Sequence, residues 1–173
     1  MDAIKIMDNF FDDETIGKIK NYLKNADYKS NCYTRPNIDI TTDIPFFRKD
    51  LTNDDFFSVY LRDIIYYNMK IKNKLNRVYI IVQSYAQYSN YHFDSQRGIT
   101  VCLYVNEYTT EESGGHIFFK IPDKTHILKI EPKYNRLVMF PANYIHRGSG
   151  FNDATIRYCI SWKFDGDELY NKE

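Results

Sequence analysis

The sequence predicts an α+β protein that is mainly β, in which two N-terminal helices pack on one sheet of an antiparallel sandwich or barrel. Apolar residues recur at helical spacing only before residue 77, and from there short β-branched or aromatic runs alternate with turn residues. Strands this short and frequent are typical of antiparallel sandwiches and barrels, not of parallel α/β sheets. We expect a helical support region over 1–76, a β core over 77–165 and a C-terminal tail over 166–173, together forming one domain.

Two helices are predicted in the N-terminal region. The first covers 12–25, where Asp12 or Asp13 can cap its first turn. The second covers 53–75, with Asn53 as a cap. Residues 27–51 show no clear period, so we expect a loop with at most one short strand. The apolar stripes of the two helices consist of Ile16, Ile19 and Leu23, and of Phe57, Tyr60, Leu61, Ile64, Ile65 and Met69.

Six strands are predicted in the C-terminal region. Each is a β-branched or aromatic run that turn residues bound on both sides. The runs are Val78–Tyr85, Ile99–Asn106, His116–Ile121, His126–Ile130, Arg136–Phe140 and Thr155–Phe164. Gly114 and Gly115 precede the third run and are expected to form a turn with positive φ.

The composition excludes several classes of protein. With 43% hydrophobic and 17% aromatic residues, the chain is not disordered. No apolar run approaches the roughly 20 residues that span a bilayer, and the N-terminus has neither a basic start nor an apolar signal core, so we expect a cytoplasmic protein without a membrane partner. The 23 basic and 23 acidic side chains cancel, which argues against a nucleic-acid partner.

Two histidines and an aspartate form the candidate chemical site. His92 and Asp94 are separated by one residue, so in an extended segment both side chains point to the same side. His146 follows 52 residues after Asp94, behind an apolar strand. Two histidines and one carboxylate make a facial triad that leaves coordination positions open for a co-substrate and O₂. On spacing alone, a surface histidine beside a turn aspartate remains the alternative.

The residues around this motif favour the metal-binding triad over a surface histidine beside a turn aspartate. The H-x-D motif is followed by the strand Ile99-Thr-Val-Cys-Leu-Tyr-Val-Asn106, by Gly114-Gly115, and by Glu131-Pro-Lys-Tyr-Asn-Arg-Leu-Val-Met-Phe-Pro141. Arg157 comes 11 residues after His146. In this order the features resemble the 2-oxoglutarate- and Fe(II)-dependent oxygenases, specifically their prolyl 4-hydroxylase-like branch, over roughly residues 77–165. The resemblance implies a double-stranded β-helix (jelly roll) core.

The resemblance also implies a set of ligands. Fe(II) would bind His92, Asp94 and His146, with 2-oxoglutarate and O₂ as co-substrates and ascorbate as an accessory reductant. Arg157 would bind the far carboxylate of 2-oxoglutarate, since a guanidinium offers two donors matched to a carboxylate. Tyr104 would contact the same carboxylate.

A second tyrosine, Tyr85, matches the co-substrate-facing tyrosine of related enzymes. The glycine usual after it is missing and the segment is short, so Tyr88 is the alternative. Arg97, Tyr91 and Trp162 are candidates for substrate binding, and no catalytic residue beyond the metal ligands is expected. His116 is expected at the rim of the site.

The resemblance leaves the substrate open. It implies hydroxylation of a prolyl residue in a peptide or protein, with a free amino acid or another small molecule as the alternative. A nucleic-acid demethylase of the same superfamily typically has arginines six and twelve residues after the distal histidine, where this chain has Asn152 and Tyr158. A jelly-roll module that binds metal without catalysis would not need Arg157.

Overall fold

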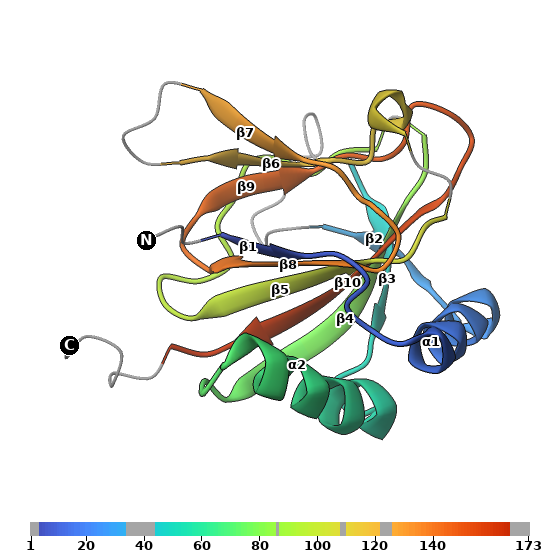
Figure 1. Ribbon diagram of the computed structural model, residues 1–173. Coiled ribbons are helices and arrows are strands. Elements are labelled where there is room, and N and C mark those ends of the chain that lie inside the picture. The colour runs from blue at the N-terminus through green and yellow to red at the C-terminus, as the bar shows by residue number, and fades with distance from the viewer. Residues whose placement is uncertain (1–3, 34–43, 86, 108–109, 122–125, 167–173) are drawn as a thin grey trace.

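The computed structural model describes residues 4–33, 44–85, 87–107, 110–121 and 126–166, which form two antiparallel sheets (Figure 1). The larger sheet has the order β1-β8-β5-β10-β4-β3-β2 and the smaller the order β7-β6-β9. The strands are β1 (Lys5–Met7), β2 (Lys29–Cys32), β3 (Phe46–Asp50), β4 (Leu75–Gln83), β5 (Ile99–Tyr104), β6 (Ile117–Lys120), β7 (Ile127–Ile130), β8 (Arg136–Pro141), β9 (Ile145–Gly148) and β10 (Arg157–Phe164). The helical elements are α1 (Asp13–Asn25), the π-helix η1 (Phe56–Leu61), α2 (Arg62–Met69) and the 3₁₀ turn η2 (Glu111–Ser113).

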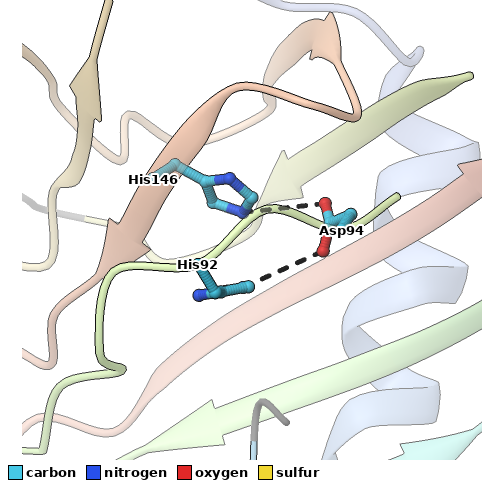
Figure 2. A group of neighbouring side chains, drawn as sticks. All are labelled: His92, Asp94 and His146. Atoms are coloured by element: carbon cyan, nitrogen blue, oxygen red, sulfur yellow. Dashed lines mark ion pairs between the residues drawn. The ribbon is translucent and has the colours of Figure 1, made fainter. Parts of the chain in front are cut away.

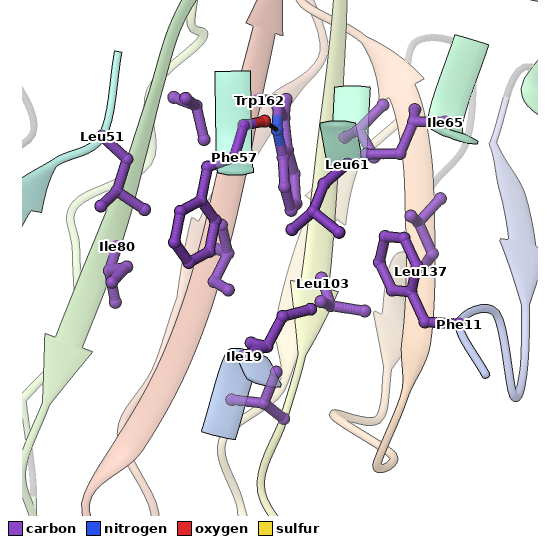
Figure 3. Close-up of a cluster of buried hydrophobic side chains, with 14 of the residues drawn as sticks. Phe11, Ile19, Leu51, Phe57, Leu61, Ile65, Ile80, Leu103, Leu137 and Trp162 are labelled. Carbon is purple, nitrogen blue, oxygen red and sulfur yellow. Dashed lines mark hydrogen bonds between the residues drawn. The ribbon is translucent and has the colours of Figure 1, made fainter. Parts of the chain in front are cut away.

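The predicted fold class is confirmed: the chain is mainly β, with two facing antiparallel sheets and helices on one of them. The inner faces of the sheets meet in a small core that contains Tyr104, Phe119, Phe140 and Cys159. The larger core lies on the other face of the seven-stranded sheet, where α1, η1 and α2 cover β4, β5, β8 and β10 (Figures 1 and 3). Among the described residues, no helix is both long and apolar enough to cross a bilayer.

The first helix forms as its sequence predicts. The Asp12 side chain accepts a hydrogen bond from the Thr15 backbone N–H over 2.7 Å, which caps the helix. Ile16, Ile19 and Leu23 are buried, so the predicted stripe faces the sheet. The amphipathic spacing therefore determines both the helix and its orientation.

The second helical segment is shorter than predicted. It begins with η1 instead of at Asn53 and ends at Met69, because Lys70 adopts a left-handed conformation with φ 58°. A left-handed residue ends a helix, and here the position has neither the glycine nor the asparagine that would mark it in the sequence. Leu75, expected as the last helical residue, instead begins strand β4.

The N-terminal region contributes strands as well as helices. β2 and β3 lie in the segment that was expected to hold at most one strand, and β1 was not predicted. Their residues are largely exposed, so they lack the alternation of apolar and polar residues that identifies a strand. Backbone pairing holds them instead: β1 pairs with β8, and β3 pairs with β4. The residues before 77 and those after it therefore share one sheet.

Alternation along β10 separates two environments. Arg157, Cys159, Ser161 and Lys163 face the space between the sheets, whereas Trp162 lies in the helix-covered core. Trp162 is fully buried, and its Nε1–H donates to the Phe57 carbonyl oxygen over 2.9 Å (Figure 3). The expectation that Trp162 contacts substrate is corrected, because the pleat of β10 turns it away from the cavity.

Trp162→Ala is expected to lower the free energy of unfolding by about 3–5 kcal/mol, since it leaves a large cavity and an unpaired Phe57 carbonyl. Urea denaturation followed by circular dichroism measures the change. Trp162→Phe should lower the free energy of unfolding by less than Trp162→Ala and leave iron affinity unchanged. A Trp162→Phe variant of unchanged stability whose substrate KM rises would contradict the assignment of Trp162 to the core.

Candidate active site

Three ligand-type side chains converge in the cavity between the sheets (Figure 2). His92 Nε2 lies 3.8 Å from Asp94 Oδ1, and His146 Nε2 lies 3.6 Å from Asp94 Oδ2. One potential ligand atom of each residue lies within 4.8 Å of the other two. His92 and Asp94 precede β5, whereas His146 belongs to β9, so the fold brings the three predicted ligands together from two distant segments.

Backbone hydrogen bonds hold the two segments side by side. His92 and His146 form an antiparallel bridge, in which His92 N–H donates to the His146 carbonyl over 3.0 Å and His146 N–H donates to the His92 carbonyl over 2.8 Å. The Asp94 N–H donates to the Ala142 carbonyl over 2.8 Å. The relative position of the ligands is thus fixed by the main chain before any metal binds.

Each histidine is oriented to offer Nε2. The His92 Nδ1 atom lies 2.8 Å from the Asn90 carbonyl oxygen, and the His146 Nδ1 atom lies 2.9 Å from the Tyr144 carbonyl oxygen. A carbonyl only accepts, so Nδ1 carries the proton and Nε2 keeps its lone pair. Burial lowers the pKa of His146 to about 4, although the nearby Asp94 opposes the shift. His146 is therefore neutral near pH 7, as a metal ligand must be.

The carboxylate of Asp94 is held by two donors. Thr100 Oγ1 donates to Asp94 Oδ2 over 2.5 Å, and the Lys163 ammonium donates to the same oxygen. Burial opposes ionisation of Asp94, but the charges of Lys163 and His146 together with these hydrogen bonds lower its pKa below the usual value. Asp94 is therefore ionised and positioned to complete the triad.

A buried arginine lies farther along the same cavity. Arg157 is 3% exposed, and it donates from Nη1 to Gln83 Oε1 over 2.7 Å and from Nε to the Gly115 carbonyl over 2.8 Å. Both acceptors are neutral, and in the described part of the chain no carboxylate pairs with Arg157. A buried cation without a counter-charge is costly, so this end of the cavity is suited to an anion.

A tyrosine hydroxyl completes this end of the cavity. The Tyr104 ring centroid lies 5.2 Å from the Arg157 guanidinium carbon. Its hydroxyl is buried and has no hydrogen-bond partner among the described residues. Buried hydroxyls are rarely left unpaired, so a bound ligand is the expected partner. The neutral His146, the ionised Asp94, the Arg157 guanidinium without a carboxylate partner and the unpaired Tyr104 hydroxyl fit Fe(II) together with a dicarboxylate such as 2-oxoglutarate.

Gly115 explains how the arginine is oriented. Its φ is +71°, and an added Cβ would lie 2.5 Å from the Phe151 ring. Only glycine fits this turn without strain, and the turn aims the Gly115 carbonyl at Arg157. Gly114 also has positive φ, at +80°, so the predicted turn is confirmed.

Several predicted site residues lie outside the cavity lining. Tyr85 is 62% exposed, and Gln83, two residues earlier on β4, occupies the position beside Arg157. Tyr88, the alternative, is also exposed and pairs through its backbone with Ser149. The tyrosine expected to face the co-substrate is thus a glutamine here, because β4 ends earlier than predicted.

The substrate candidates lie on the surrounding surface. Arg97 is exposed, between the H-x-D motif and β5. Tyr91 is half-buried, and its ring contacts Lys120 and Arg147. Neither residue lines the cavity, so their contact with substrate stays a prediction. His116 is buried next to Phe118 and is not part of the metal-ligand cluster.

Sequence reasoning missed the residues that line the cavity from β3 and β4 and at the end of β10. These are Arg48, Arg77, Tyr79, Gln83 and Lys163. A signal for Lys163 was present, because positions 157, 159, 161 and 163 of an extended strand share one face. The others depend on which strands pair, and no local pattern shows that.

Comparisons with known proteins agree with this geometry. A model of the 2OG-Fe(II) oxygenase superfamily, in which 2OG denotes 2-oxoglutarate, matches residues 79–162. That segment contains the triad, Tyr104 and Arg157. No curated protein matches the sequence.

Solved structures share the fold at low sequence identity. A prolyl hydroxylase from Trichoplax adhaerens, in complex with a hypoxia inducible factor peptide fragment, has a TM-score of 0.75 and 15% identity, covering 100% of this chain and 89% of its own. A prolyl-4-hydroxylase from Pseudomonas putida has a TM-score of 0.69 and 14% identity, and the match covers 95% of this chain and 93% of the hydroxylase. The α-ketoglutarate-dependent epimerase SnoN from nogalamycin biosynthesis has a TM-score of 0.69 and 10% identity, and the match covers 95% of this chain and 79% of SnoN.

The matched segment defines the class: residues 79–162, which hold the triad, Tyr104 and Arg157, match the 2OG-Fe(II) oxygenase superfamily, and the chain shares the fold of solved prolyl hydroxylases. Its cofactors are accordingly Fe(II), 2-oxoglutarate and O₂, and its fold is that of the prolyl hydroxylases. Because the same fold also carries an epimerase, it does not define the substrate or the final reaction.

Proposed function

We propose that this oxygenase hydroxylates a prolyl residue in a peptide or protein and converts 2-oxoglutarate to succinate. The observation that carries the oxygenase activity is that one cavity holds the facial triad and Arg157, whose acceptors among the described residues are neutral. The similarity in fold to two prolyl hydroxylases, one in complex with a peptide, supports the prolyl substrate.

Each residue of the cavity has a defined task in this proposal. His92, Asp94 and His146 hold the metal, and Thr100 and Lys163 hold the Asp94 carboxylate in place. Arg157 and the Tyr104 hydroxyl donate to the far carboxylate of 2-oxoglutarate, while Gln83 and Gly115 orient the guanidinium. When bound, the iron supplies the redox chemistry that couples decarboxylation of 2-oxoglutarate to oxygenation of a C–H bond.

Purified protein with Fe(II), ascorbate and 2-oxoglutarate is expected to form succinate, faster in the presence of proline-containing peptides than without them. Mass spectrometry should find one added oxygen on a proline. Substrate stimulation is expected because closing the site around a substrate excludes water from the reaction. The control omits iron.

Two results would contradict parts of the proposal. Succinate release that no proline peptide stimulates would retain the oxygenase and reject the prolyl substrate, leaving a free amino acid or another small molecule. Binding of iron and 2-oxoglutarate without succinate under any condition would favour a non-catalytic metal-binding module.

A further inference from the structure

Three cationic side chains surround one aromatic ring in the cavity. The guanidinium carbons of Arg48 and Arg77 lie 5.6 Å and 5.5 Å from the ring centroid of Tyr79, and the Lys163 ammonium lies 5.7 Å from it. All four residues line the cavity that holds the metal triad. We refer to Arg48, Arg77 and Lys163 as the cationic cluster. A neutral aromatic face attracts each cation but cancels none of their charge.

The strand register builds this cluster. β10 pairs with β4 so that Lys163 lies directly opposite Arg77 and Arg157 directly opposite Gln83. Like charges directly opposite each other in a sheet destabilise it. The pairing therefore places two positive charges opposite each other, although two uncharged residues at these positions would make the sheet more stable.

Few acidic groups balance the cluster. Lys163 contacts Asp94, whose carboxylate is also the metal ligand. Asp50 on β3 is influenced by both arginines: burial opposes its ionisation, but hydrogen bonds from Thr52 and the charges of Arg48 and Arg77 lower its pKa. Within the described ranges, the guanidinium groups of Arg48 and Arg77 have no ion pair or hydrogen bond. With Asp94 bound to metal, the three cations carry more charge than the Asp50 carboxylate beside the two arginines can balance.

Lys163 and Arg77 of the cluster lie away from the co-substrate subsite at Arg157. Lys163 and Arg157 are six positions apart on β10, which corresponds to about 20 Å along an extended strand. A five-carbon diacid that reaches Arg157 from the triad cannot also reach Arg77. The cavity thus has one cationic end for 2-oxoglutarate and a second cationic group beyond the metal ligands.

We propose that the cationic cluster binds a carboxylate of the substrate, so that the hydroxylated molecule is an acid whose carboxylate lies close to the reacting carbon. The inference rests on the proposed oxygenase function and narrows its substrate class. Planar guanidinium groups pair with carboxylates through two parallel hydrogen bonds. The carboxylate comes either from a small amino-acid-like molecule or from an acidic residue of a peptide.

Matched acid and amide probes test this inference by binding, without turnover. The protein is loaded anaerobically with Fe(II) and saturating 2-oxoglutarate, which occupies the Arg157 subsite. Calorimetry then compares N-acetyl-L-proline with its amide, N-acetyl-L-leucine with its amide, and acetyl-Ala-Pro-Glu-amide with acetyl-Ala-Pro-Gln-amide. The first two pairs represent a small acid and the third an acidic peptide residue. The leucine pair separates the carboxylate preference from the preference for proline.

The acid of at least one pair is expected to bind about tenfold or more tightly than its amide, as for a charged hydrogen bond. Arg77→Gln and Arg48→Gln should each remove most of this preference. Arg77 is exposed and faces Lys163, so Arg77→Gln should melt no lower than the unaltered protein. Arg62→Gln is the matched control, because Arg62 pairs with Asp63 on α2, on the other face of the sheet.

Equal binding of acid and amide in every pair, including no binding of either, would overturn the inference. An acid preference that survives both Arg77→Gln and Arg48→Gln would also overturn it. Neither result depends on turnover. Failure of the oxygenase function would appear separately, as absent iron-dependent succinate formation in the presence of intact acid binding.

Discussion

Replacing His146 with alanine is expected to weaken iron binding more than about 100-fold, beyond the 10–100-fold typical of losing an outer-shell partner of a metal. His146 is buried, and its Nε2 is presented to the site by the hydrogen bond between Nδ1 and the Tyr144 carbonyl. Besides His92 and Asp94, no described histidine or carboxylate belongs to the ligand cluster, so no side chain can replace His146. Anaerobic titration with Fe(II) measures the loss, and iron-dependent succinate formation should vanish with it.

His126→Ala is the matched control for this variant. His126 is exposed and lies outside the cluster, so its replacement should leave iron affinity and succinate formation unchanged. Circular dichroism establishes that both variants are folded. Succinate formation that survives His146→Ala in a folded protein would reject the ligand assignment.

Arg157→Gln is expected to raise the KM for 2-oxoglutarate about 100- to 10,000-fold while iron still binds. Two charged hydrogen bonds to a carboxylate are lost, each worth about 1.5–3 kcal/mol. The guanidinium is buried with neutral acceptors only, Gln83 and the Gly115 carbonyl, so its charge is directed to a ligand. Succinate formation at increasing 2-oxoglutarate concentration gives the KM, and Fe(II) titration gives the metal affinity.

Arg157→Lys separates charge from geometry in this experiment. The ammonium keeps the charge but loses the two-pronged donor, so the KM should fall between those of the unaltered protein and Arg157→Gln. An unchanged KM in Arg157→Gln would reject the co-substrate role. The variant would then be expected to show only a structural defect, visible as a lower melting temperature.

The two variants together distinguish an oxygenase from a module that only binds metal. In an oxygenase, His146→Ala removes iron binding, whereas Arg157→Gln spares iron and affects only 2-oxoglutarate. In a simple metal-binding module, Arg157→Gln would change nothing except stability. The structure favours the first pattern, because Tyr104 and Arg157 both present donors without an anionic or hydroxyl partner among the described residues.

Local sequence determined much of the fold. The stripe of α1 and its Asp12 cap are readable because an amphipathic helix repeats its contacts every turn. All six predicted strands are present, with ends that shift by a few residues. Strands β1, β2, β3 and β9 were not identified, because short or exposed strands carry little alternation and are held by backbone pairing.

In the candidate site, too, some residues could be predicted from the sequence, whereas others depend on long-range strand pairing. The spacing of His92 and Asp94 and the order of His146 and Arg157 indicated the ligands, because the chemistry of a facial triad restricts residue types. The resemblance implies that Tyr85, or Tyr88 as the alternative, faces the co-substrate, but Gln83 is the β4 side chain that lies beside Arg157. That position depends on where β4 ends against β10, and pairing of segments about 75 residues apart leaves no local mark.

The sequence by itself determined the fold class through local periodicity, and its resemblance to the oxygenases predicted the triad and the arginine. Only the tertiary structure decided that Lys163 holds Asp94, that Arg77 lies opposite Lys163, and that Trp162 faces the helices instead of the substrate. The physical reason is that strand alternation is a local property, whereas strand register is set by long-range pairing and by burial of one face. The strand register brings Arg48, Arg77 and Lys163 together into the cationic cluster.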